Sequence, residues 1–309
     1  MQILFNVMEQ GLIFGIVAVG VYITYRILDF PDLSVDGSFP LGAAITAAWV
    51  VKGGDPYVAC LLAIIGGCLA GFLTGFLHVV LKISNLLSGI LVMMALYSIN
   101  LRVMKKPNES LLMADKLILP GSSEPIVRIL IVLAFAMAVK LLIDLFLKTK
   151  LGFVLKAVGD NEQLVTSLAI NKSKIKVIGL VIANGLVALA GSILAQSQSY
   201  SDVNMGTGVV VMGLAAVIVG EALIGYIKKL SPLFNFIKAT SAVIVGAIVY
   251  QAALALAMRL GLPSSDLKLI TATIVVLALS LNGDLFKKFK FTRKSSVGGD
   301  GIAPNTKSA

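Results

Sequence analysis

The sequence predicts an all-α polytopic membrane protein with roughly 8–10 transmembrane helices, some of them short or broken. Of its 309 residues, 58% are apolar and only 14% are charged, and the mean hydropathy is +0.95. A soluble domain of this length would carry about 25% charged residues. Apolar runs close to the length that crosses a bilayer as a helix recur along the chain, which makes a membrane domain the expected fold.

Taken in order, these runs predict roughly nine helical crossings, two of them short. They lie at 8–28, 39–51, 57–81, 86–104, 125–147, 177–197, 208–224, 239–257 and 267–283. We therefore expect one transmembrane domain over residues 1–284. The remaining residues, 285–309, form a basic tail that begins with lysines and continues into a Ser/Gly-rich stretch, which we expect to be partly disordered.

Two of the predicted crossings carry features that indicate how they pack. In 57–81, Gly67, Gly71 and Gly75 are spaced four residues apart, a pattern that lets membrane helices approach closely. In 125–147, Lys140 and Asp144 are one helical turn apart and can form an ion pair.

The net charge of +10 follows from lysines in the loops and the tail, which favours a membrane protein over a nucleic-acid-binding one. The loop 148–176 carries six of these lysines and is therefore expected in the cytoplasm. Counting crossings from it places the C-terminus in the cytoplasm and the N-terminus outside. The loop 105–124 conflicts with this count, because it holds three lysines and falls outside.

The loop 148–176 itself predicts a short amphipathic helix at the membrane surface. Asp160 is expected to cap it, with Gln163 completing a capping box. Its apolar face would be formed by Leu164, Val165, Leu168 and Ala169. A polar loop with such a helix indicates a docking site for another protein.

The segment 29–40 interrupts the apolar pattern with three acids, two serines and two prolines. Its polar side chains are Asp29, Asp32, Ser34, Asp36 and Ser38. Acids among membrane helices favour a pathway or gate element, because irregular backbone at that depth must be satisfied by protein or water. The alternative is a plain cytoplasmic turn in which Asp36 or Ser38 caps the helix that follows.

Further polar side chains lie in the other predicted crossings. They are Asn100, Asn184, Gln196 and Glu221. Each could line a pathway, and each could instead tie helices together. For Glu221, an ion pair with Lys228 or Lys229 near the cytoplasmic end is the stronger expectation.

No motif in the sequence supports catalysis by this chain. There is no GxxxxGK[ST] phosphate loop, no HExxH, no GxSxG and no Cys/His cluster. We therefore expect no enzymatic activity, no metal site and no cofactor in this chain.

Three stretches resemble one family. GFVLKAVGDNEQLVTSLAIN (152–171) resembles the cytoplasmic coupling loop of bacterial ABC importer permeases of the branched-chain amino acid and ribose type. DFPDLSVDGSFPLGAAITAAWV (29–50) and LSGILVMMALYSINLRVM (87–104) resemble a subgroup that works with lipoprotein-type solute-binding proteins for aromatic or other amino acids. The resemblance covers roughly residues 8–284.

The resemblance implies a permease subunit in the bacterial cytoplasmic membrane that moves a small solute, expected to be an amino acid, inward. Its partners would be ABC ATPase subunits, which bind ATP and Mg, an extracytoplasmic solute-binding lipoprotein and a second copy of the chain. The ATPase would dock on Gly152, Ala157, Gly159, Asp160, Asn161, Leu164, Val165, Leu168 and Ile170.

An ion-coupled secondary transporter or channel is the alternative, with the acids of 29–36 as ion sites. Such a protein would be expected to contain inverted repeats with matching broken helices. The sequence shows no second-half partner for 29–42. The amphipathic loop is explained only by the ABC permease.

Overall fold

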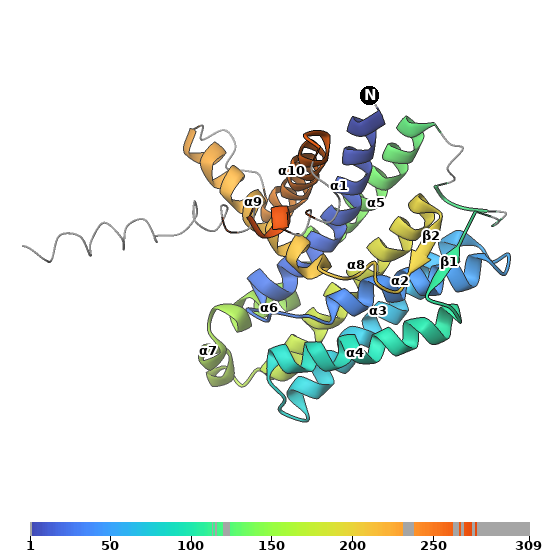
Figure 1. Ribbon diagram of the computed structural model, residues 1–309. Coiled ribbons are helices and arrows are strands. Elements are labelled where there is room, and N and C mark those ends of the chain that lie inside the picture. The colour runs from blue at the N-terminus through green and yellow to red at the C-terminus, as the bar shows by residue number, and fades with distance from the viewer. Residues whose placement is uncertain are drawn as a thin grey trace, which may run out of the picture.

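The computed structural model describes residues 2–112, 114, 116–119, 124–230, 238–261, 266, 269–273 and 276. These residues form a helical bundle with one small two-stranded sheet (Figure 1). The elements are α1 (Gln2–Val21), the π-helix η1 (Tyr22–Ile27), α2 (Val35–Val50), α3 (Pro56–Val79), α4 (Asn85–Met104), β1 (Asn108–Ser110), α5 (Pro125–Phe146), α6 (Lys150–Asp160), α7 (Glu162–Ser167), α8 (Lys172–Gln198), β2 (Tyr200–Asp202), α9 (Val209–Leu230) and α10 (Ala239–Arg259).

Six helical stretches are long and apolar enough to cross a membrane. They are Ile3–Ile27, Pro56–Val79, Asn85–Met104, Pro125–Phe146, Lys172–Gln198 and Ala239–Arg259. The two shorter helices are α2 and the apolar part of α9, Val209–Gly225. Eight of the predicted crossings are thus helical in the structure. The ninth, 267–283, lies mostly outside the described residues, as does the tail 285–309.

The two ends of the bundle are distinguished by contacts between elements. At one end Arg128 on α5 donates to Glu9 on α1 and to the carbonyl of Ser197 on α8. At the opposite end Gly159 of α6 lies against the carbonyl of Ile27, where η1 ends. The chain therefore starts at the end opposite to α6 and α7, as the count of crossings predicts (Figure 1).

The loop that conflicts with the charge count lies at the end away from α6 and α7. Its strand β1 pairs antiparallel with β2, which follows α8 directly, so that Asn108 faces Asp202. Lys106 forms an ion pair with Glu109, with 3.0 Å between Nζ and Oε1. The bias counts Lys and Arg rather than net charge, so this pair does not remove the conflict.

The helix α8 is the central element, and the glycines of α3 let it pack closely there. A Cβ at Gly67 or Gly71 would overlap the α8 backbone, and one at Gly75 would lie 2.9 Å from a methyl group of Val177. The predicted glycine face is confirmed. The ion pair between Lys140 and Asp144 is also confirmed, with 3.2 Å between the charged atoms.

The bundle contains a second interrupted crossing, which the sequence analysis missed. After β2 the chain runs through 203–208 and then begins α9, whose first amides bond to Asp36 in the first turn of α2. The N-termini of two short helices therefore meet. The expectation that 29–42 has no partner in the second half is wrong. The run 203–208 contains neither proline nor acid, and its contact with Asp36 exists only in the fold.

The two halves of the bundle are built alike, and each packs its third helix against the first helix of the other. The unit α1–α2–α3 packs its third helix against α8, and the unit α8–α9–α10 packs its third helix against α1. Since α1 and α8 run in opposite directions, the two units have inverted topology. An inverted repeat therefore does not distinguish the two transport classes weighed above.

Candidate functional site

The interrupted segment 29–34 lies deep in the bundle and is held there by a buried hydrogen-bond network. One carboxylate oxygen of Asp32 accepts from the amide and hydroxyl of Ser34 at 2.8 and 2.6 Å, and the other accepts from Nδ2 of Asn184 at 2.8 Å. The carbonyl oxygen of that Asn184 amide accepts from Ser38 at 2.6 Å. Asn184 lies about 18 Å along α8, close to its middle.

Segment 29–34 runs from the end of η1 back to the middle of the central helix, where α2 continues the crossing, so the plain-turn alternative is wrong. We call residues 29–34 the re-entrant segment. The capping that went with the plain-turn alternative is also wrong. The helix α2 already begins at Val35, so neither Asp36 nor Ser38 caps it. The hydroxyl of Ser34, which occupies the N-cap position, bonds instead to Asp32 and Asn184.

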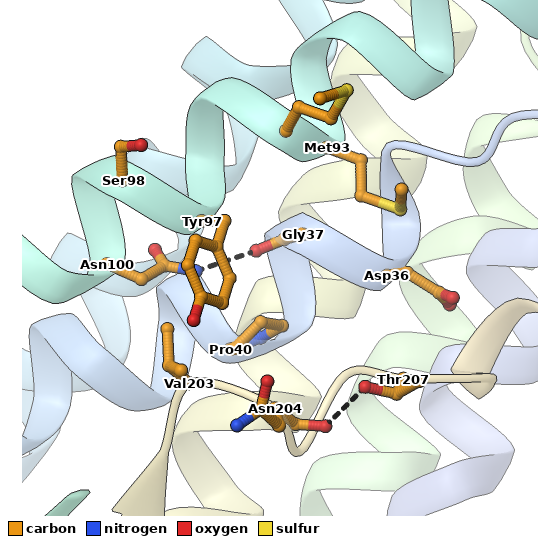
Figure 2. Close-up of a pocket in the computed structure, with 11 residues that line it drawn as sticks. Asp36, Gly37, Pro40, Met93, Tyr97, Ser98, Asn100, Val203, Asn204 and Thr207 are labelled. Atoms are coloured by element: carbon orange, nitrogen blue, oxygen red, sulfur yellow. Dashed lines mark hydrogen bonds between the residues drawn. The ribbon is translucent and has the colours of Figure 1, made fainter. Parts of the chain in front are cut away.

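A cavity of about 510 Å³ opens where the two interrupted crossings meet (Figure 2). Its walls come from the start of α2, the middle of α4 and the run 203–207. The lining residues are Asp36, Gly37, Pro40, Met93, Met94, Tyr97, Ser98, Asn100, Val203, Asn204 and Thr207. Most of this lining is apolar or aromatic, with a few polar groups, which is the usual character of a small-molecule site.

Asp36 provides the charge of the cavity. Its two carboxylate oxygens accept from the amides of Gly208 and Val210 at 3.0 and 2.8 Å, at the start of α9. Asp36 itself lies in the first turn of α2. Helix N-termini carry partial positive charge, which offsets part of the cost of burying a carboxylate here. No cationic side chain among the described residues pairs with it.

Asn100 provides a buried amide at the other side of the cavity. Its Nδ2 donates to the carbonyl of Gly37 at 3.3 Å (Figure 2). Its Oδ1 has no hydrogen-bond partner among the described residues, although the residue is only 1% exposed. A buried carbonyl oxygen without a donor costs free energy, which a bound donor group would recover.

Of the nine predicted pathway residues, only two, Asp36 and Asn100, line the cavity. Four form the buried network, namely Asp32, Ser34, Ser38 and Asn184, and the other three lie elsewhere. Asp29 is exposed in a left-handed conformation, with φ at 51°. Gln196 is fully buried and accepts from the amide of Ile118. Glu221 pairs with Arg26 on η1 at 3.1 Å. The side chains of its predicted partners, Lys228 and Lys229, lie outside the described residues.

The cavity also includes side chains that the sequence analysis did not select. These are Met93 and Tyr97 on α4 and Thr207 before α9. The only signal in the sequence was the polar run 203–208 between two apolar stretches. It could not show that this run enters the bundle beside Asp36.

The coupling segment contains two helices, and its cap differs from the prediction. Asp160 is the last residue of α6 rather than a cap. Asn161 caps α7, because its side-chain oxygen accepts from the amides of Gln163 and Leu164, both at 3.0 Å. The turn between the two helices shifts the N-cap by one residue relative to the capping-box pattern.

The apolar residues of α7 divide between two directions. Val165 is 1% exposed and packs into the core, whereas Leu164 is 55% and Leu168 is 63% exposed. Ala169 lies beyond the helix in a left-handed conformation, with φ at 58°. The predicted single apolar face is therefore wrong. One valine anchors the short helix, and the two leucines are left for contacts outside this chain.

The rest of the coupling segment is packed tightly against the membrane helices. A Cβ at Gly159 would overlap the carbonyl of Ile27, and one at Gly152 would overlap that of Phe146. Ala157 and Ile170 pack against the main hydrophobic core. The segment is thus in contact with η1, directly before the re-entrant stretch that leads to Asp36.

An ion-pair cluster fastens α7 to the start of α8. Glu162 accepts from Lys172 at 3.0 Å and also from Lys176. The two lysines, Lys176 more strongly than Lys172, hold the pKa of Glu162 below its usual value. Because α7 has only six residues, it depends on such contacts to keep its place.

Comparison with known proteins then identifies the family. Residues 3–281 match the model of the branched-chain amino acid transport system permease component. The chain belongs to this family. It is 53% identical over 292 residues to a tyrosine transport system permease protein of Clostridioides difficile, covering 94% of this chain and 95% of that protein.

More distant relatives agree with this assignment. A galactofuranose transporter permease of Escherichia coli is 25% identical, over 82% of this chain and 72% of that protein. A chain of the PsaBC complex from Streptococcus pneumoniae, solved with a Fab, has the same fold, with a TM-score of 0.54 at 14% identity over 90% of this chain and 91% of that one. The protein is a permease subunit of an ABC importer, and the secondary-transporter alternative is not favoured.

Proposed function

We propose that this permease imports tyrosine or a closely related aromatic amino acid. The observation that carries the proposal is the 53% identity to a tyrosine transport system permease across nearly the whole chain. A cavity lined by Met93, Met94 and Tyr97, with Asp36 at its edge, fits a solute that has an apolar ring and a charged amine.

The energy for transport comes from ATP and Mg bound to a separate ATPase, which docks on the coupling segment. The two exposed leucines of α7, Leu164 and Leu168, are the contacts that enter the ATPase. Movement of α7 is transmitted through α6, because Gly159 lies directly against the end of η1. From η1 the chain continues into the re-entrant segment, so a shift there changes the cavity. In this scheme the coupling segment lies in the cytoplasm.

A second copy of the chain completes the pathway, and a solute-binding lipoprotein delivers the amino acid from the outside. Its docking surface is the end of the bundle that carries β1 and β2, opposite to α7. The exposed apolar faces of α4 and α5 fit contact with lipid or with the second copy.

The docking residues are tested by the double variant Leu164→Asp with Leu168→Asp. The permease should still assemble in the membrane, because both side chains point away from the core, but the ATPase should no longer co-purify and tyrosine uptake should cease. For co-purification of the ATPase, Leu112→Asp is the matched control, because Leu112 is 80% exposed at the opposite end. An ATPase that still co-purifies with the double variant would contradict the assignment.

The substrate is tested with the complete importer in proteoliposomes. Labelled tyrosine should cross the membrane only when ATP is present on the side that carries the ATPase and the binding protein is present on the opposite side. Excess unlabelled tyrosine or tryptophan should compete, whereas ribose should not. Uptake of a sugar in place of an aromatic amino acid would overturn the proposed substrate.

A further inference from the structure

The contact between the two interrupted crossings leaves one carboxylate in an unusual position. Asp36 lies beside the cavity, and its oxygens each accept one backbone amide from the start of α9. No lysine, arginine or histidine among the described residues forms an ion pair with it. Each carboxylate oxygen has a second acceptor position, so two amides do not exhaust its capacity.

Other acids at the ends of the bundle are compensated. Glu9 is paired with Arg128, Asp144 with two lysines and Glu221 with Arg26. Asp32 is buried, and its carboxylate accepts three hydrogen bonds within the fold. Asp36 differs because it combines a free acceptor position, a negative charge and a cavity.

The cavity supplies two further features that a ligand requires. Met93 and Tyr97 present polarizable and aromatic surface, which suits the body of an apolar solute. The Oδ1 of Asn100 is buried without a donor. This second observation is independent of Asp36, and it indicates that the site is built to receive a donor group from outside this chain.

We propose that this cavity is a solute-recognition site of the permease itself, in which Asp36 binds the primary ammonium group of the solute and Asn100 accepts a hydrogen bond from a second donor on it. The proposal rests on the proposed import of an aromatic amino acid and identifies the ammonium group as the part of that solute that the permease recognises. No cationic side chain among the described residues pairs with Asp36, so a bound ammonium group would supply its counter-charge.

The first test replaces Asp36 by asparagine in the complete importer. Asp36→Asn keeps an oxygen that can accept from α9 and removes the charge. Tyrosine uptake should fall about tenfold or more, the cost of losing a hydrogen bond between two charged groups. Co-purification of the ATPase with Asp36→Asn at the wild-type level is the control for folding and assembly. Wild-type uptake by Asp36→Asn would overturn the proposal.

A loss of uptake could also arise if Asp36 only holds α9, so a second measurement reads the charge of the cavity directly. Thr207→Cys places a thiol on the cavity wall, next to the amide that Asp36 accepts. The native cysteines are first replaced by Cys60→Ala and Cys68→Ala. Thiol labelling is then compared between a cationic and an anionic methanethiosulfonate, in the full chain with its ATPase.

After each rate is divided by the rate of the same reagent with a free thiol in solution, the cationic reagent should react roughly tenfold faster than the anionic one, and Asp36→Asn should remove most of that preference. Saturating tyrosine should slow both reactions. Equal rates with Asp36 present would overturn the proposal. This charge preference does not depend on the transported substrate. A failure of tyrosine uptake by the unmodified importer would therefore contradict the proposed function, whereas the labelling rates would still test the charge of the cavity.

Discussion

At the residue scale, three asparagine side chains form hydrogen bonds that hold segments of this permease in place. Asn184 holds the re-entrant segment by bonding to Asp32 and Ser38. Asn161 caps α7, and Asn100 lies in the cavity wall. An amide can donate and accept at once without carrying charge, so it can join segments inside a membrane at lower cost than an ion.

The ion-pair cluster of Glu162 makes the coupling segment sensitive to acid. Because the pKa of Glu162 is lowered in the folded protein, its contribution to stability is present above the unfolded value near 4.5 and is lost as the pH falls through the lower folded value. We expect amide hydrogen exchange in residues 162–168, corrected for intrinsic rates, to accelerate below about pH 4.5.

The control for this prediction is Glu162→Gln, which removes the titrating group. In this variant the segment should exchange faster already at neutral pH and should show little further change in acid. If wild type and Glu162→Gln had the same dependence on pH, the cluster with Lys172 and Lys176 would not be what holds α7.

At the element scale, close approach between helix backbones governs the packing of the interrupted crossing. Gly42 on α2 lies so close to Ala188 on α8 that an added Cβ would overlap the backbone carbonyl. Backbone cannot move aside as the end of a flexible side chain can. The short helix is thus held against α8 both by this contact and by the network around Asn184.

Replacing Gly42 by alanine should therefore destabilise the permease by about 1–3 kcal/mol, the usual cost of overpacking. The measurement is the melting temperature of the detergent-solubilised protein, which should fall. Gly225→Ala is the matched control, because nothing lies within 4 Å of its added Cβ. That variant should melt at or above the wild-type temperature, since alanine favours helix by up to about 1 kcal/mol. Equal melting of both variants would contradict the close-packing argument.

At the scale of the whole molecule, the inverted units bring the starts of α2 and α9 to one cavity. The helices α2 and α9 both begin at the same depth, one leading towards each end of the bundle. The coupling segment contacts η1 at one end, and the charged cluster of Glu9 and Arg128 joins α1, α5 and α8 at the other. The cavity lies between these two fastened ends.

The cluster of Glu9 and Arg128, at the end opposite to the coupling segment, should matter for the whole fold, because α5 is otherwise packed loosely at the edge. Glu9→Gln leaves the largely buried Arg128 without its charge partner, which should cost about 3–5 kcal/mol and lower the melting temperature. Combining Glu9→Gln with Arg128→Met should recover most of the loss. Single and double variants that all melt at the wild-type temperature would show that this ion pair does not stabilise the fold.

Much of this protein could be read from the sequence. Hydrophobic length identified eight crossings that the structure contains, the glycine spacing in α3 identified its close contact with α8, and lysines marked the coupling segment. These features are local, because the bilayer imposes a length, a composition and a charge bias on each stretch separately. The three resembling stretches added the family.

Only the tertiary structure decided which partner each polar group has. Asp36 bonds to amides more than 170 residues away, Asp32 bonds to Asn184, and Glu221 pairs with Arg26 on η1. It also decided that Asn161 rather than Asp160 caps α7. A membrane interior obliges every polar group to find a partner, but many partners are chemically equivalent. Which one is chosen depends on how the two inverted units bring distant segments to the same depth.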